Sequence, residues 1–256
     1  MRITAKISVV IPAILLILLS CNKQNEWLDE PRKKEELTIK SVKDMQELLN
    51  NTTIFNTSMP AIGLIGCDNI LVKDSELGRV NVIEKNAYLW TKDIYEGQIS
   101  TDYFTAYKGI VYANVVLESL KNLKIESNDP ASYRQISGQA CFYRAYMYSE
   151  LVNLFCKAYN SATANTDKGI CIKRSSDVNQ IVQRSSVLEC YSQILEDATT
   201  ASSLLGKTGL FTTQPTKLSA WGLLARVYLS MNNYEKSFQF ADSVVKNNTQ
   251  LIDFTF

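Results

Sequence analysis

Histidine is absent from the 256 residues of this chain. Its absence excludes the Ser-His-Asp and Cys-His arrangements of nucleophilic hydrolases and removes the commonest zinc ligand. An enzyme built from carboxylates, lysine or tyrosine is still allowed. Asp93 and Glu96 sit three residues apart in an expected helix, but without a second convergent cluster they make a poor acid/base pair. We therefore expect no catalytic residues, no metal site and no cofactor.

A charge excess is also missing, because the formal net charge is +1. Whole-chain charge thus gives no reason to expect a nucleic-acid partner. None of the six cysteines forms a CxxC pair, which disfavours a zinc ribbon or a thioredoxin-like site. With Cys21 set aside, we interpret the other five as small buried residues. Cys156 and Cys171 flank a loop-like segment, so these two could instead pair in an oxidising compartment.

The N-terminus has the pattern of a secretory signal. A positive flank precedes an apolar stretch, 7–19, that ends at the small Ser20. This stretch is too short to span a bilayer comfortably. Leu18-Leu19-Ser20-Cys21 resembles a bacterial lipobox, in which the cysteine becomes the first mature residue and carries lipid. The alternative is an ordinary signal peptide with a chance cysteine, but the polar run that follows Cys21 favours the lipoprotein.

These features predict a signal peptide over 1–20, a lipidated tether over 21–40 and a helical body over 41–256. Stable membrane anchoring needs more than one acyl chain, and a multiply acylated Cys21 meets that need.

The body is mainly helical by its hydrophobic periodicity. Helix starts are marked by Ser41, by Asp129 before Pro130 and by the capping box Ser186 to Glu189. Two irregular stretches interrupt the pattern, 51–86 with one or two short strands and 156–185. The expected helices are 41–50, 102–123, 130–155, 186–205, 215–231 and 234–247.

The last two helices carry a repeat pattern. Trp221, Leu224, Ala225 and Tyr228 have the W-x2-L-[G/A]-x2-Y spacing of a tetratricopeptide helix A, and helix B begins at Tyr234. The segment "CFYRAYMYSELVNLF" predicts another helix A, whose partner helix 191–205 follows the irregular insert. The predicted fold is therefore a mainly α, tetratricopeptide-like helical-repeat array with long irregular loops.

In combination, several segments resemble the SusD/RagB family of Bacteroidetes outer-membrane lipoproteins. They are the lipobox cysteine with "WLDEP", then "YLWTKDIYEG", "YKGIVYANVVLESL", "GQACFYRAYMYSELVNLF", "RSSVLECYSQILEDATTA" and "KLSAWGLLARVYLSMNNYEKSFQFA". The resemblance implies a non-enzymatic, surface-facing lipoprotein that captures nutrients, above all glycans, for a TonB-dependent SusC-like transporter.

Members of that family are typically about twice as long as this chain. We therefore expect a SusD-like protein that lacks the C-terminal half, either as a fragment or truncated gene product or as a shortened relative. Two alternatives to glycan capture follow: a helical-repeat scaffold that binds only protein, and an inactive fragment.

The resemblance also implies where a glycan would bind. Family members bind glycans with exposed aromatic and polar side chains, some of them from the loop before the helix that has the W…D.Y pattern of "YLWTKDIYEG". Aromatic faces stack on sugar rings, and polar side chains bond the hydroxyls. In the alternative interpretation, Tyr88 and Trp90 anchor the core and the polar residues are merely solvated. The candidate ligand-binding residues are Asp68, Asn69, Asp74, Arg79, Asn86, Tyr88 and Trp90.

Three further expectations are structural. Asn114, inside an apolar stripe, should hydrogen-bond a neighbouring loop rather than a ligand. Arg144 and Arg226 should pair with carboxylates. The tyrosines between residues 143 and 148 should pack between repeats rather than form a sugar platform.

Overall fold

The computed structural model describes residues 39–57 and 59–248. The expected signal peptide, Cys21 and the tether as far as residue 38 lie outside this range, so these interpretations stay predictions. Among the described residues, no helix has both the length and the apolar character needed to cross a bilayer. The elements are α3 Val42–Leu49, η2 Thr53–Thr57, α4 Ile62–Ile65, α5 Val82–Tyr88, α6 Thr101–Asn122, α7 Ile125–Asn128, α8 Pro130–Phe155, β1 Lys168–Cys171, β2 Arg184–Ser186, α9 Val187–Leu204, α10 Lys217–Ser230 and α11 Tyr234–Asn247.

Most helix starts are set by side-chain caps, as the sequence predicts. The Ser41 hydroxyl accepts a hydrogen bond from the Asp44 N–H at 3.2 Å, and the Asp44 carboxylate accepts one from the Ser41 N–H at 3.0 Å. Asp129 caps α8, and Ser186 forms the predicted capping box with α9. The start of α10 was predicted two residues early, because Thr216 rather than a residue before Pro215 provides the cap.

The segment between α3 and α6 differs from the prediction. It contains the short helices η2, α4 and α5, and its described residues form no strand. Phe55 of η2 stacks on Tyr143 with 4.2 Å between ring centroids, which anchors the segment to α8. The prediction of a helix around Asp93 and Glu96 is also wrong. Glu96 and Gly97 have φ values of 47° and 76° and form a turn.

The second irregular stretch contains a hairpin that the sequence analysis did not predict. Strands β1 and β2 pair antiparallel, with Lys168 opposite Ser186. They have only four and three residues, too few to show an alternating pattern. Cys171 is the last residue of β1, and Cys156 directly follows α8. Both are free thiols, so the structure contains no disulfide between them.

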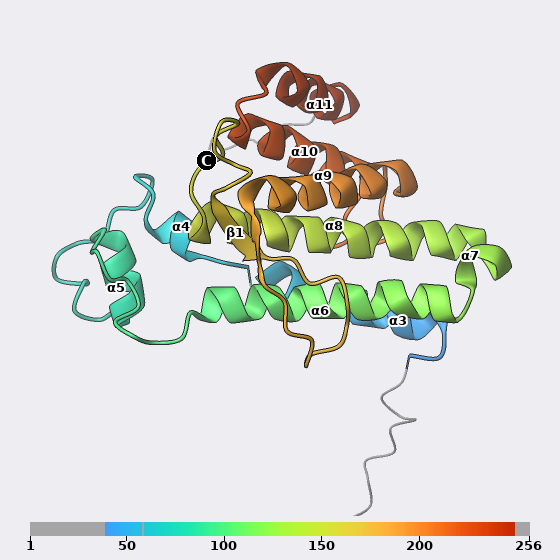
Figure 1. Cartoon of the computed structure of the whole chain (residues 1–256), viewed down its shortest axis with the longest axis horizontal. Helices are drawn as coiled ribbons and strands as arrows, with labels where there is room; N and C mark the ends of the chain where they lie inside the picture. Colours follow the sequence, from blue (N-terminus) through green and yellow to red (C-terminus); the bar gives the residue numbers. More distant parts are fainter. Residues whose placement is uncertain (1–38, 58, 249–256) are drawn as a thin grey trace, which may run out of the picture. The chain divides into compact units, whose positions relative to one another are not determined.

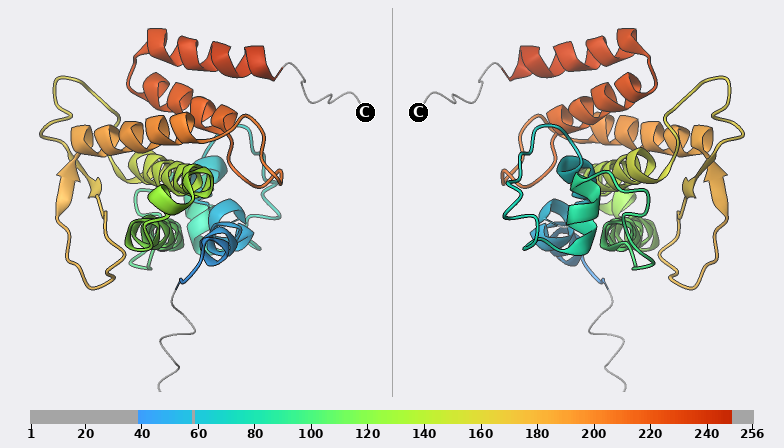
Figure 2. Two further views of the ribbon diagram at one scale, coloured as in Figure 1. Left: turned by 90° about the vertical axis from the view of Figure 1, so that its right-hand side faces the viewer. Right: turned by 90° about the vertical axis from the view of Figure 1, so that its left-hand side faces the viewer.

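The long helices form successive layers, in the order α6, α8, α9, α10 and α11 (Figures 1 and 2). Tyr228 of α10 stacks on Phe240 of α11 at 5.7 Å, and the Ser237 hydroxyl donates to the Ala225 carbonyl at 2.9 Å. This close approach at Ser237 is the packing expected of helices A and B in a tetratricopeptide pair. The pairs α8–α9 and α10–α11 thus confirm the predicted repeats.

A buried polar network joins three layers, and it confirms the structural prediction for Asn114. The Asn114 amide donates to the carbonyls of Lys173 and Ser175, in the loop after β1, at 2.8 and 3.1 Å. Arg144 of α8 donates to the Asn114 side-chain oxygen at 2.8 Å and binds the Asp197 carboxylate of α9 through two nitrogens. Each of the three guanidinium nitrogens thus donates to an acceptor, the pairing that an enclosed charge requires.

The expected role of the tyrosines holds only in outline. Tyr143 and Tyr148 are buried, and their hydroxyls bond the backbone of neighbouring loops. The Tyr143 hydroxyl donates to the Thr213 carbonyl at 3.2 Å. The Tyr148 hydroxyl donates to the Lys173 carbonyl at 2.7 Å and accepts from the Lys173 N–H at 2.8 Å. Arg226 pairs with Glu150, as predicted.

Candidate functional site

The seven expected ligand residues all lie in one lobe, residues 61–99, which contains α4 and α5 and precedes α6 (Figure 1). We call it the α4–α5 lobe. It is attached to the long helices at defined points. The Ile62 N–H donates to the Asp102 carboxylate of α6 at 3.2 Å, and Tyr95 stacks on Phe155 at the end of α8, with ring centroids 6.5 Å apart. The lobe is thus fixed on the helices that carry it.

Four of the expected residues are exposed polar side chains. Asp68 and Asn69 follow α4, and Asp74 and Arg79 lie in the loop before α5. Arg79 pairs with the half-exposed Glu76 at 2.9 Å, an interaction that contributes little to stability in water. The side chains of the other three make no hydrogen bond to another described residue, so their full bonding capacity faces solvent.

The two expected aromatic residues behave differently. The Tyr88 hydroxyl accepts a hydrogen bond from the Val72 N–H at 3.1 Å and ties the preceding loop to α5. Trp90 is 80% exposed, so it is not a core anchor. Its φ of 53° lies in the left-handed region, which costs a non-glycine residue of order 1–3 kcal/mol. The indole is therefore exposed on a residue whose backbone is locally strained.

Asn86 is buried and is used inside the lobe. Its side-chain amide donates to the Glu96 carboxylate at 2.8 Å and to the Ile94 carbonyl at 3.2 Å. These bonds fix the turn that follows Trp90. A ligand contact by Asn86 stays a prediction, whereas its structural role is visible.

The lobe also contains a cavity of about 330 Å³ where α4, α5 and α6 begin. We call it the lobe cavity. Its volume falls at the lower end of the roughly 300–1,000 Å³ typical of small-molecule sites. None of the seven expected residues lines it. The lining is polar at Asn81, Glu84, Tyr95, Gln98, Thr101 and Asp102, and apolar at Ala61, Ile62, Ile65, Val82 and Ile83.

Several polar groups of the lobe cavity keep bonding capacity after their internal bonds are made. Asn81 caps α5 by accepting the Glu84 N–H at 2.9 Å, which leaves its amide N–H groups free to donate. The Tyr95 hydroxyl accepts from the Ser100 hydroxyl at 3.1 Å and can still donate its own proton. Donors and acceptors thus stand beside aliphatic side chains, a combination that suits a polyhydroxylated ring. Among the described residues, no cluster of histidine, cysteine, aspartate or glutamate could hold a metal ion.

One signal for the lobe cavity was present in the sequence. Asn81, three residues before Glu84, has the spacing of an N-cap and marks the start of α5. The cavity forms where the starts of α4, α5 and α6 meet, and these starts are 20 and 19 residues apart in the chain. Nothing in the sequence indicates that they come together. The cavity lining was therefore missed, although Tyr95 was part of a quoted segment.

Comparison with known proteins agrees with this architecture. A SusD-like family, described as starch-binding and associating with the outer membrane, matches residues 26–229. The SusD-like protein P2 of Formosa agariphila is 27% identical over 154 residues, which make up 60% of this chain and 28% of that protein. A SusD superfamily protein of Bacteroides thetaiotaomicron superimposes with a TM-score of 0.68 at 25% identity, over 83% of this chain and 48% of that one.

A further SusD superfamily structure, from Bacteroides fragilis, has a TM-score of 0.67 at 23% identity, over 80% of this chain and 50% of that one. This chain thus spans about half the length of these solved structures. The family match covers most of the sequence, and the layered repeats reproduce the fold. The chain therefore belongs to the SusD-like family and has its mainly α, tetratricopeptide-like fold.

Proposed function

We propose that this chain captures glycans as part of a non-enzymatic outer-membrane lipoprotein and passes them to a TonB-dependent SusC-like transporter. Lipid on Cys21 would hold it at the cell surface, and the helical repeats would dock the transporter. The family description, starch-binding and associating with the outer membrane, supports this assignment. The observation that carries it is the α4–α5 lobe, which combines an exposed Trp90 with the partly polar lobe cavity.

The chemistry of the lobe suits a sugar chain better than a single sugar. An exposed indole offers a flat apolar face on which a sugar ring can stack. The lobe cavity offers amide, carboxylate and hydroxyl groups for sugar hydroxyls. Because Trp90 does not line the cavity, we propose an oligosaccharide, with one ring on the indole and another in the cavity.

Calorimetric titration with maltoheptaose tests the glycan proposal. We expect Trp90→Ala and Gln98→Ala each to weaken binding about tenfold, a loss of about 1.4 kcal/mol. Phe211→Ala is a matched control, because Phe211 is also an exposed aromatic residue, at 61%, but lies outside the lobe. Equal affinity of all three variants would contradict the assignment to this lobe, and no binding to a panel of soluble glycans would contradict capture itself.

The alternative of a protein-binding scaffold is favoured by exposed apolar residues on α11, among them Phe238 and Val245. Affinity capture from detergent-solubilised outer membranes, with the SusC-like transporter identified by mass spectrometry, separates the two. Transporter capture without any glycan binding supports the scaffold. Capture together with glycan binding supports the full proposal.

Attachment through Cys21 is tested by radiolabelled palmitate. We expect label in the wild-type chain and none in Cys21→Ala. Label that persists in the variant would show that the lipid is attached elsewhere.

A further inference from the structure

A second cavity lies where the end of α8 meets the β1–β2 hairpin (Figure 1). We call it the hairpin cleft. Its volume of about 400 Å³ is within the roughly 300–1,000 Å³ of small-molecule sites, so it has room for a sugar ring. Its described lining residues include three cations, Lys157, Lys168 and Arg184, and one carboxylate, that of Asp167. The charges of the cleft are therefore unequal in number.

One of the three cations is neutralised inside the cleft. The Lys157 ammonium donates to the Asp167 carboxylate at 2.6 Å, and the Thr163 hydroxyl donates to its other oxygen, also at 2.6 Å. These hydrogen bonds lower the pKa of Asp167, so the carboxylate is ionised at neutral pH. Lys157 and Asp167 thus cancel, and the charge that remains in the cleft is that of Lys168 and Arg184.

Arg184 of β2 is held in place without being neutralised. Its Nε donates to the Gly169 carbonyl at 2.7 Å and its Nη2 to the Lys168 carbonyl at 3.2 Å, both across the hairpin on β1. These carbonyls carry no net charge, and burial raises the pKa of the Cys156 thiol beside the guanidinium, so the thiol is uncharged too. Because a guanidinium has five N–H donors, Arg184 can still bind a planar, charged acceptor.

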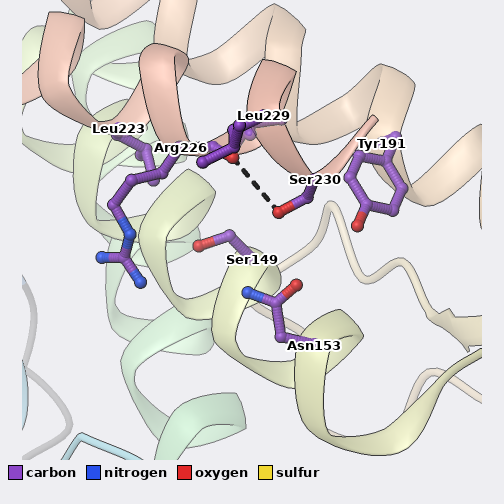
Figure 3. A pocket seen from close by; sticks show the side chains of 8 residues that line it. Ser149, Asn153, Tyr191, Leu223, Arg226, Leu229 and Ser230 are labelled. Atoms are coloured by element: carbon purple, nitrogen blue, oxygen red, sulfur yellow. Dashed lines mark hydrogen bonds between the residues drawn. The ribbon is translucent and has the colours of Figure 1, made fainter. Parts of the chain in front are cut away.

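Lys168 adds a second cation that is not balanced. It is exposed at the start of β1, and it forms no ion pair within the part of the chain that the structure describes. The smaller pocket between α8 and α10, of about 140 Å³, is the opposite case (Figure 3). Its one cation, Arg226, donates to the Glu150 carboxylate at 3.1 Å, so no further anion is needed there. The hairpin cleft, in contrast, favours an anionic ligand.

The other lining groups suit a sugar. The Thr166 hydroxyl donates to the Thr163 carbonyl at 3.0 Å, which leaves its oxygen to accept from a ligand hydroxyl. Phe155 lines the cleft and also stacks on Tyr95, which lines the lobe cavity, with 6.5 Å between ring centroids. The two cavities are thus linked through one aromatic pair, a separation that an oligosaccharide can span.

We propose that the hairpin cleft binds the carboxylate of a uronic acid residue, so that the glycan captured by this chain is acidic. The inference rests on the proposed function and names its substrate class. Arg184 binds the carboxylate through its remaining N–H groups, whose planar arrangement matches the two oxygens, and Lys168 supplies the second positive charge. The lobe cavity takes neighbouring rings of the same chain, and the cleft selects the charged one.

Calorimetric titration with trigalacturonic acid tests the inference. Its methyl ester keeps the same three rings and lacks the charge. We expect the acid to bind at least about tenfold more tightly than the ester, and the difference to shrink at high salt. Equal binding of acid and ester, or no binding of the acid, would overturn the inference. Tighter binding of a sulfated galactotriose than of the acid would overturn the choice of a carboxylate.

Two charge variants of the cleft locate the site. Lys168→Gln should weaken binding of the acid about fivefold or more and leave the ester unchanged. Lys121→Gln, at an exposed lysine of α6, removes the same charge outside the cleft and should bind the acid as the wild type does. Asp167→Asn removes a carboxylate from the lining and should tighten binding, a gain that misfolding cannot produce. Unchanged affinity in both cleft variants, or equal losses in the two lysine variants, would overturn the inference.

Titration with maltoheptaose separates this inference from the proposed function. Neutral maltoheptaose should bind Lys168→Gln and the wild type equally, because the lobe lies outside the cleft. Maltoheptaose binding without any preference for trigalacturonic acid would overturn the acidic class and leave glycan capture intact. No binding of either oligosaccharide would contradict both.

Discussion

Gly169 shows how a single missing side chain allows the hairpin to pack on α9. A Cβ atom at this position would lie 2.7 Å from the Ser186 carbonyl oxygen and would also collide with the Cys190 sulfur. We expect Gly169→Ala to lower the free energy of unfolding by roughly 1–3 kcal/mol, the usual cost of overpacking. Urea unfolding followed by circular dichroism measures the change.

The control for this prediction is Gly222→Ala in α10, where an added Cβ meets no other atom within 4 Å. Alanine is a better helix former than glycine by about 1 kcal/mol, so this variant should be as stable as the wild type or more stable. If the two alanine variants unfold at the same urea concentration, close packing at Gly169 is not the reason for the glycine.

Asp197 leads to a second prediction at this scale. It is 3% exposed and binds Arg144, whose side chain is 12% exposed, at 2.7 Å. Asp197→Ala leaves that guanidinium buried without its partner, which typically costs about 3–5 kcal/mol. Asp242→Ala, which removes an exposed ion pair with Lys246, should cost well under 1 kcal/mol. Chemical unfolding measures the loss in free energy of unfolding for both variants. Equal losses would contradict a structural role for the buried pair.

Individual residues differ in how far their roles could be predicted. Asn114 was predictable because a polar side chain in an apolar stripe must find an internal partner, and it does so in the loop after β1. Trp90 was not, because its hydrophobicity indicates neither its 80% exposure nor its left-handed backbone conformation. Asn86 lies in a polar context, so nothing in the sequence signalled that its amide holds the next turn.

At the scale of elements, the loop between β1 and β2 is held against α6 by two residues one turn apart (Figure 1). Asn114 binds its start, and the Glu118 carboxylate accepts hydrogen bonds from the Ser176 N–H, at 3.0 Å, and from the Ser176 hydroxyl. Burial acts to raise the pKa of Glu118, but the hydrogen bonds from Ser176 outweigh it and the pKa is lowered.

A lowered pKa fixes the sign of the pH dependence. The charged form of Glu118 stabilises the folded state above its unfolded pKa of about 4.3, and this contribution is lost as the pH falls through the lower folded-state value. We therefore expect Glu118→Gln to have a lower Tm than the wild type at pH 7 and the gap to close below about pH 4. Glu126→Gln, at an exposed carboxylate of α7, should show no such closing gap. A Tm difference that is constant from pH 7 to pH 3 would contradict this role of Glu118.

Helices were predictable where caps and hydrophobic periodicity agree. The bounds of α8 and α11 match the expected ones, and α6 is shifted by one residue. The hairpin and the short helices of the α4–α5 lobe were not predictable, because elements of three to seven residues are too short to establish a period. The lobe cavity depends on how these short elements meet in space, so its residues could not be assembled from sequence spacing alone.

At the scale of the whole molecule, α11 is the last layer that the structure describes, and one of its faces is exposed and apolar. Exposed apolar patches mark sites of association between proteins. Here Tyr234, Phe238 and Val245, spaced four and seven residues apart on one helix face, are each at least 64% exposed among the described residues. No residue of α11 is fully buried, although Phe240 stacks on α10. We expect this face to make the chain self-associate as its concentration rises.

Phe238→Lys should therefore lower the apparent mass in concentrated solution, as measured by size-exclusion chromatography with light scattering. Its free energy of unfolding should change by less than about 0.5 kcal/mol, because the side chain is 70% exposed. Gln239→Lys adds the same charge at the neighbouring position and should leave the association unchanged if the apolar face, rather than net charge, drives it. If both lysine variants lower the mass equally, charge repulsion is the cause. If neither does, the outer face of α11 is not where the chains meet.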